Sequence, residues 1–290
     1  MIPLIYNENM REEKPIDHSI ARFNVLTTLL SLINTREEDD TDLVIARYFI
    51  EHLNEITHTS IYKIADECYV SRSSVQRFIK KLGYDSYTQM KNGLDEIIEH
   101  EKGFINYTDH TDYRNYLDLA IESMSKDIID TSKSPSFKKL VNIFENAETI
   151  VILTAEDSSH ACKLFQQQLL SMGKLIRIIT SASNNISLLN TLTEKDLLMV
   201  CSVTGNYALA IRDHLDDIKA KKILLTINRT TAFEGKYSFI YYLSSQVLLS
   251  SYTIQGVRNV YNNYALVVFF DILFHDYYVD MQGKKKSPLP

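Results

Sequence analysis

The apolar positions of residues 60–82 recur at the spacing of two short helices. In the first half they fall at i, i+3, i+4 and i+7, on one face of a helix, at Ile61, Ile64, Ala65 and Cys68. The second half repeats this spacing with Val75, Phe78, Ile79 and Leu82. Ser71 is a favourable N-cap for the second helix, and Gly83 stands where a left-handed C-terminal cap is favoured. Because the connection is so short, the pattern predicts a helix-turn-helix.

Further helical periodicity surrounds this motif. Before it, apolar stripes predict one helix over residues 20–33 and another over residues 43–53, with the acidic stretch 36–42 as the loop between them. After it, residues 86–98 predict one more helix that opens with capping-box spacing. The following stretch, residues 101–116, is polar and aromatic without a clear period, so we expect a linker there.

From residue 149 the pattern changes to short, continuous apolar runs. They alternate with segments of helical length, and they are TIVILT (149–154), LIRIIT (175–180), LLMVCSV (197–203), KILLTI (222–227) and FIYYL (239–243). Continuous apolar character is typical of strands buried on both faces, so these runs predict an α/β domain with a mainly parallel sheet. Ligands of such sheets bind beyond the carboxyl ends of the strands, which directs attention to the loops after Thr154, Val203 and Ile227.

These patterns divide the chain into two domains. We expect a helical helix-turn-helix domain (1–100), a linker (101–116), an α/β domain (117–283) and a tail (284–290). The length of 290 residues fits two domains, and 45% hydrophobic with 23% charged residues is an ordinary globular composition. The apolar stretch 257–280 predicts a long helix with more hydrophobic surface than one sheet face needs. We therefore expect a homodimer or a dimer of dimers.

Cysteine usage and hydropathy narrow the class of protein further. The three cysteines are scattered and show neither a disulfide framework nor a metal-binding spacing. No apolar run is long enough to span a bilayer. We therefore expect a cytoplasmic protein with no membrane partner, no metal site and no cofactor.

The face of the second helix that its apolar stripe leaves free carries side chains suited to DNA. The candidates are Ser71, Arg72, Ser73, Gln76, Arg77, Lys80 and Lys81. Arginine can bond guanine and glutamine can bond adenine through two hydrogen bonds, while hydroxyls and lysines suit phosphates. Residues 36–70 are predominantly acidic, whereas residues 71–92 are basic with Asp85 as their single acidic residue. This local charge favours operator DNA over the alternative, a solvated face of an ordinary helical bundle.

A dense pattern of matching residues runs through this region. It consists of Ser60, Ile61, Ala65, Val70, Ser71, Ser74, Val75, Arg77, Phe78, Lys80, Lys81, Leu82, Gly83 and Tyr84. This pattern resembles the N-terminal domain of the RpiR family of bacterial sugar-responsive regulators. One departure is Tyr69, at a turn position that is often glycine in the family. Because tyrosine incurs a steric cost at positive φ, we expect the turn to be built differently here.

Two stretches of the α/β domain follow a second family pattern. Residues 165–173 and 196–202 are similar to the first helix and the third strand of the SIS (sugar isomerase) domain. The resemblance implies a Rossmann-like parallel sheet that binds a phosphosugar. The G-x-G-x-S loop of that family aligns with residues 154–158, where both glycines are missing. Glu156 and Asp157 instead place two negative charges at the expected anion site, which disfavours a phosphate and suits the hydroxyl groups of an uncharged or amino sugar.

The loop after the third predicted strand keeps more of the SIS pattern. Residues 202–207 resemble the S-x-S-G-x-T phosphate loop with its glycine retained. The resemblance implies that Ser158, Ser202, Thr204, Gly205 and Asn206 contact the ligand. The alternative is that these are only turn residues at the beginning of a helix, and the residues alone leave both open.

The resemblance as a whole implies a transcriptional regulator of carbohydrate metabolism. It would bind operator DNA and sense a sugar phosphate or a related metabolite. One alternative is a phosphosugar isomerase with Glu156, Asp157 and His160 as acid and base candidates, although no nucleophile or metal constellation accompanies them. Another is a regulator whose SIS-like domain has lost its ligand and serves only dimerisation. We expect no enzymatic activity.

Overall fold

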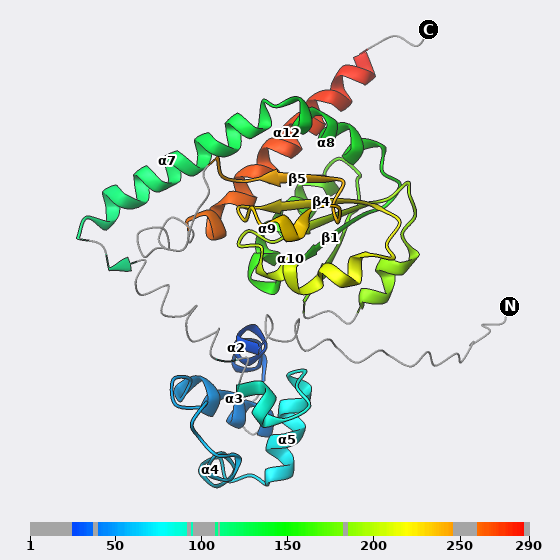
Figure 1. The fold of residues 1–290 in the computed structure, drawn as a ribbon. Helices are drawn as coiled ribbons and strands as arrows, with labels where there is room; N and C mark the ends of the chain where they lie inside the picture. Colours follow the sequence, from blue (N-terminus) through cyan, green and yellow to red (C-terminus); the bar gives the residue numbers. More distant parts are fainter. Residues whose placement is uncertain are drawn as a thin grey trace, which may run out of the picture.

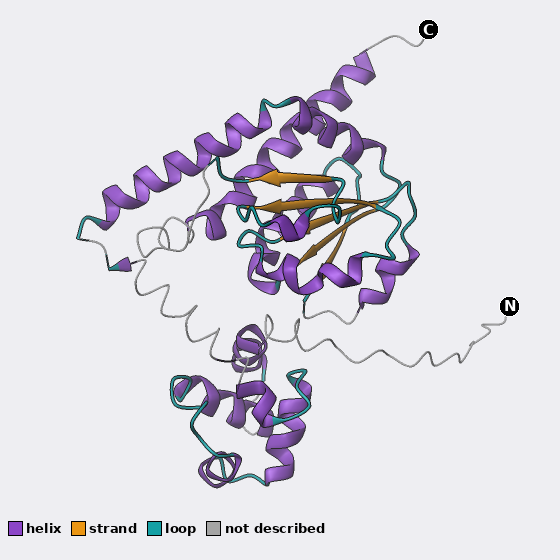
Figure 2. Ribbon diagram, viewed as in Figure 1, coloured by secondary structure: helices purple, strands orange, loops and turns teal. Residues whose placement is uncertain are grey.

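The computed structural model describes most of the chain in two groups of elements. The described residues are 25–36, 40–91, 94, 108–109, 111–181, 185–245 and 260–286. The first group is helical, and the second combines a parallel sheet with helices (Figures 1 and 2). This confirms the predicted fold class, a helix-turn-helix region followed by a Rossmann-like α/β domain.

The N-terminal group contains four of the helices predicted from the apolar stripes. They are α2 (Val25–Thr35), α3 (Thr41–Glu51), α4 (Ile61–Glu67) and α5 (Arg72–Lys81). The predicted loop 36–42 ends earlier than expected, because Asp40 caps α3 by accepting a hydrogen bond from the backbone N–H of Asp42 at 2.7 Å. Residues 20–24 of the first predicted helix lie outside the described residues, as do residues 92–93 and 95–98 of the predicted helix 86–98.

A single apolar cluster holds these helices together. Phe78 of α5 meets Phe49 of α3 edge to face, with ring centroids 5.7 Å apart. The hydroxyl of Tyr87 donates to the backbone oxygens of Ile56 and Thr59, so the segment after α5 is tied to the α3–α4 connection. The cluster fixes which faces of α4 and α5 point outward.

The second group is built on five parallel strands, all near the predicted positions. They are β1 (Ile150–Thr154), β2 (Arg177–Thr180), β3 (Leu197–Cys201), β4 (Lys221–Thr226) and β5 (Phe239–Tyr242), in the order β2-β1-β3-β4-β5. Successive strand residues enter different cores. Ile150 and Ile152 join the cluster on one face, whereas Val151 and Leu153 join the cluster on the other. This two-sided burial is the physical reason for the continuous apolar runs.

Helices cover both faces of this sheet. One face packs against α7 (Tyr113–Ser132), α8 (Pro135–Asn146), α9 (Ser159–Leu170) and α12 (Leu266–Lys286), and the other against α10 (Asn206–Ile211) and short 3-10 turns (Figure 1). A short π-helical segment, Tyr261–Ala265, precedes α12. Helical structure thus extends into the stretches predicted as linker (101–116) and tail (284–290). In the part of the chain that the structure describes, no helix has the length and hydrophobicity to cross a bilayer.

Asp196 fixes the segments that enter β1 and β3. Its buried carboxylate accepts hydrogen bonds from the backbone N–H of Thr149 at 2.9 Å and from the N–H and hydroxyl of Thr193 at 2.7 and 2.8 Å. Burial by itself raises the pKa of this carboxyl. The hydrogen bonds from Thr193 and Thr149 outweigh burial, so the pKa lies below its ordinary value.

We expect Asp196→Asn to lower the free energy of unfolding by about 1 to 3 kcal/mol at pH 7, because an amide group cannot accept all three hydrogen bonds. A carboxylate with a lowered folded-state pKa stabilises the protein above its unfolded pKa of about 4, and this stabilisation is lost as the pH falls through the folded-state value. The difference between native and variant protein should therefore shrink in acid. Urea unfolding at pH 7 and below about pH 4 measures it. The exposed control Asp157→Asn should change little, and a variant as stable as the native protein would contradict this assignment.

Candidate nucleic-acid interface and ligand loops

Serine caps begin both helices of the motif. The hydroxyl of Ser60 accepts a hydrogen bond from the N–H of Lys63 at 3.2 Å, and that of Ser71 accepts one from the N–H of Ser74 at 3.1 Å. On α5 the buried residues are Val75, Phe78 and Ile79. The capped start and the buried stripe together fix the rotation of α5.

The seven residues predicted from sequence, at the N-cap of α5 and within it, are all exposed. They are Ser71, Arg72, Ser73, Gln76, Arg77, Lys80 and Lys81. Within the described residues, the side chains of Gln76, Arg77 and Lys80 form no hydrogen bond and no ion pair. No described residue therefore occupies the polar groups of these three side chains.

The other four predicted residues already have contacts inside the protein. The hydroxyls of Ser71 and Ser73 lie 2.8 Å apart. The guanidinium of Arg72 lies over the ring of Tyr62, 4.4 Å from its centroid. Lys81 forms an ion pair with Asp42 of α3. The sequence pattern therefore marked the exposed face of α5, but it did not indicate which of these side chains have contacts within the protein.

The turn between α4 and α5 has the ordinary geometry despite Tyr69. Tyr69 adopts a φ of 54°, its N–H donates to the oxygen of Asp66 at 3.2 Å, and the N–H of Val70 donates to the oxygen of Ala65 at 2.9 Å. These two bonds define a Schellman cap, in which glycine is the usual residue at the position of Tyr69. The expectation of a different turn was wrong, because the chain keeps the left-handed conformation and accepts its steric cost.

The loop after β1 is tied to the start of α9. Thr154 pairs with Cys201 of β3, so the loops after β1 and β3 leave the same edge of the sheet. The carboxylate of Glu156 lies 3.6 Å from the ammonium of Lys163 and accepts a hydrogen bond from the hydroxyl of Ser159 at 3.3 Å. Its negative charge is thus partly compensated within the protein, whereas Asp157 is exposed.

The loop after β3 uses two predicted ligand residues for its own structure. The hydroxyl of Ser202 accepts a hydrogen bond from the N–H of Ala208 at 3.1 Å. Gly205 adopts a φ of +83°, and a Cβ on it would lie 2.6 Å from the Cβ of Asn228. Ser202 and Gly205 therefore have structural roles in this loop whether or not a ligand binds.

The remaining predicted ligand residues differ in their exposure. Ser158 is buried, Thr204 is partly exposed and Asn206 is exposed. Sequence reasoning missed Asn228, whose side-chain amide donates to the backbone oxygen of Thr204 at 3.0 Å. Asn228 directly follows the run that predicted β4, and its position after Ile227 was the available signal.

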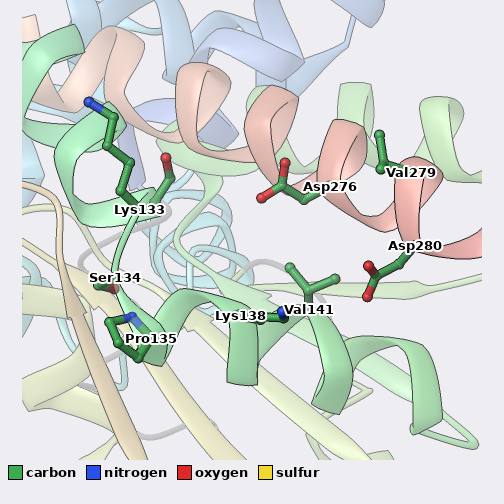
Figure 3. A pocket seen from close by; sticks show the side chains of 9 residues that line it. Lys133, Ser134, Pro135, Lys138, Val141, Asp276, Val279 and Asp280 are labelled. Atoms are coloured by element: carbon green, nitrogen blue, oxygen red, sulfur yellow. The ribbon is translucent and has the colours of Figure 1, made fainter. Parts of the chain in front are cut away.

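A surface cavity of about 450 Å³ lies elsewhere in this domain, between the α7–α8 junction and the C-terminal half of α12 (Figure 3). Its lining residues are Ser132, Lys133, Ser134, Pro135, Lys138, Val141, Asp276, Val279 and Asp280. None of the predicted ligand residues lines it.

Metal-ligand types and candidate acids, bases and nucleophiles can be located among the described residues. They contain no group of three or more His, Cys, Asp or Glu side chains that could hold a metal ion. Burial and a contact with Cys162 raise the pKa of the Cys201 thiol well above its ordinary value, which disfavours a thiolate nucleophile. Of the acid and base candidates, Glu156 is engaged with Lys163 and Ser159.

The chain is similar in sequence to two curated proteins and similar in structure to a solved protein. Over 168 residues the chain is 23% identical to the HTH-type transcriptional regulator GlvR of Bacillus subtilis, and over 174 residues it is 22% identical to the uncharacterized HTH-type transcriptional regulator YfhH of Escherichia coli. The alignments cover 58% and 57% of this chain and only 62% of the length of each relative. A structural alignment with the Vibrio vulnificus NanR protein complexed with ManNAc-6P covers 90% of this chain and 94% of the NanR chain. The two aligned sequences are 17% identical, and the TM-score is 0.42.

A family model gives the assignment of the N-terminal domain. Residues 27–101 match the model described as a helix-turn-helix domain of the rpiR family. The match includes the whole of the motif in residues 60–82 and confirms the resemblance found there. The chain therefore carries a helix-turn-helix domain of the rpiR family.

Proposed function

We propose that the chain is a transcriptional regulator of carbohydrate metabolism that binds operator DNA through α5. The observation that supports this most is the exposed face of α5, where Gln76, Arg77 and Lys80 have no partner in the described part of the chain. A helix of this kind fits the major groove, where such side chains bond bases and phosphates. The two curated relatives are named as HTH-type transcriptional regulators, which supports the same function. The free cysteines suit a reducing cytoplasm.

In this proposal the α/β domain senses a sugar phosphate or a related metabolite at the loops after β1 and β3. Both loops lie at the carboxyl edge of a parallel sheet, where ligands of such folds bind. Ser158, Thr204 and Asn206 are the proposed contacts, and Ser202 and Gly205 hold the second loop in shape. Glu156 and Asp157 weaken binding of a dianionic group, although Lys163 offsets part of this effect.

The proposed regulator acts as a homodimer or a dimer of dimers. Exposed apolar side chains on α9 and α12 support this, since Leu170 and Val279 are 63% and 50% exposed. A single short reading helix also offers few base contacts, and paired helices supply the affinity that an operator requires. We propose no enzymatic activity, because the carboxylate of Glu156 is engaged within α9 and no metal cluster accompanies it in the described residues.

Substitutions on α5 should separate base reading from phosphate anchoring. Arg77→Ala or Gln76→Ala should weaken binding to an operator selected from random DNA by about 1 to 3 kcal/mol while changing affinity for mixed-sequence DNA less. Lys80→Ala should weaken both and reduce the salt dependence by about one unit of slope. Fluorescence anisotropy across a salt series measures these effects, with the exposed α8 residue in Lys139→Ala as control. If Arg77→Ala lowers both affinities by one factor, Arg77 is not a reader.

Substitutions in the two ligand loops should change effector binding in opposite directions. Thr204→Ala should abolish binding because it removes the proposed hydroxyl contact, and Thr204→Ser should retain binding because it keeps a hydroxyl. The loop should keep its shape in both variants, since the Asn228 amide bonds the backbone oxygen of Thr204. Glu156→Gln should strengthen binding of phosphorylated sugars by about tenfold through removal of like charge.

Calorimetry with a panel of hexose 6-phosphates and their unphosphorylated sugars measures both effects. Asp157→Asn removes the other negative charge of this loop and is measured for comparison. Tight binding by the native chain that Glu156→Gln does not improve would show that this carboxylate lies away from the ligand. No binding of any sugar by any variant would favour the alternative in which the α/β domain only dimerises.

The native chain should sediment as a dimer or tetramer and protect two half-sites on its operator. Their centres should lie about one helical turn of DNA, or a multiple of it, apart, because a two-fold axis relates the reading helices. Analytical ultracentrifugation and footprinting test this. A monomer that binds a single half-site tightly would exclude the dimeric proposal.

A further inference from the structure

Tyr62 and Tyr69 are exposed aromatic residues beside the start of the reading helix. They are 59% and 96% exposed. Neither hydroxyl forms a hydrogen bond with a residue that the structure describes. Neither residue belonged to the contact set predicted from sequence.

The conformation of Tyr69 carries a steric cost that burial of its own side chain does not offset. At φ 54° the Cβ of Tyr69 lies unfavourably close to the backbone. The corresponding position after α5 is occupied by Gly83, with φ 90° and the same pair of capping hydrogen bonds. A side chain that is 96% exposed gains almost no burial in return. Strained residues of this kind are concentrated at functional sites, so the benefit of Tyr69 is expected from a partner.

Tyr62 contacts the first residue of α5. Its ring supports the guanidinium of Arg72 at 4.4 Å, and Arg72 is the first residue of α5. This stacking restricts a long, flexible side chain at the end of the reading helix. Tyr62 and Arg72 therefore lie together at the start of α5, and Tyr69 stands in the turn that precedes this helix.

We propose that Tyr62, Tyr69 and Arg72 form an aromatic edge that contacts the DNA backbone next to the groove in which α5 lies. This inference rests on the proposed DNA-binding function. The N-terminal end of a reading helix enters the groove, and Tyr69 immediately precedes the segment Val70–Ser71 that leads into α5. Tyrosine hydroxyls donate hydrogen bonds to phosphate oxygens, and such contacts add affinity without depending on base sequence.

Uncharged contacts have a signature that separates them from lysine contacts. Neutralising a phosphate releases counterions and makes affinity depend on salt, whereas a phenol hydroxyl releases none. Loss of either tyrosine hydroxyl should therefore lower affinity at every salt concentration and leave the slope unchanged. Lys80→Ala, in contrast, should change the slope.

The test uses the full chain and a mixed-sequence DNA duplex between about 50 and 200 mM salt, with binding followed by fluorescence anisotropy and stability by thermal unfolding. Tyr69→Gly should raise the unfolding midpoint, because it relieves the left-handed strain, and should weaken DNA binding about 3- to 10-fold. Tyr69→Phe and Tyr62→Phe should weaken binding about 2- to 5-fold with little change in the midpoint. Tyr278→Phe, at an exposed tyrosine of α12, is the matched control and should change neither quantity.

The opposite signs expected for Tyr69→Gly make the result decisive. A higher midpoint with unchanged DNA affinity would overturn the proposal and point to a protein contact or to no contact at this edge. A lower midpoint would overturn the strain argument and the proposal with it. If the native chain does not bind the duplex at all, the proposed function itself fails. If the native chain binds and Lys80→Ala weakens it while the three tyrosine variants do not, only the aromatic edge is excluded.

Discussion

The burial of one face of α5 determines what its other face can do. Phe78 packs edge to face on Phe49 of α3, and Val75 and Ile79 are buried beside it. A helix held in this way cannot rotate without exposing its apolar stripe, so Gln76, Arg77 and Lys80 remain outward. The helical core of this domain thus acts as a support that presents these polar side chains in a fixed order.

The sequence was sufficient for features that depend on local spacing. The five strands were predictable because each contributes apolar residues to the clusters on both faces of the sheet, and α5 was predictable because its stripe, the Ser71 cap and the Gly83 cap agree. Contacts between loops were not predictable. The bond from the Asn228 amide to the oxygen of Thr204 joins the loops after β4 and β3, and no periodicity links those two positions. The same holds for the ion pair between Lys81 and Asp42.

The two Schellman caps show that glycine is preferred but not required at the left-handed position. Gly83 and Tyr69 accept the same left-handed conformation and the same two hydrogen bonds, at φ 90° and 54°. The steric cost at a non-glycine residue is of the order of 1 kcal/mol, and the apolar packing of α4 and α5 is larger than that. The turn is therefore imposed by the helices on either side of it, and the residue within it adapts.

Charge sets a further constraint on how the proposed regulator could bind DNA. Its formal net charge is −6, and of the basic residues on α5, Lys81 already forms an ion pair with Asp42. Arg72, Arg77 and Lys80 form no ion pair in the described part of the chain, so counterion release from this helix would be limited to a few phosphate contacts. In the proposed regulator, affinity for DNA would then depend also on uncharged hydrogen bonds and on the pairing of two such helices. A chain with few free cations gains selectivity in this way, because the sequence-independent attraction that retains a protein on any DNA is weak.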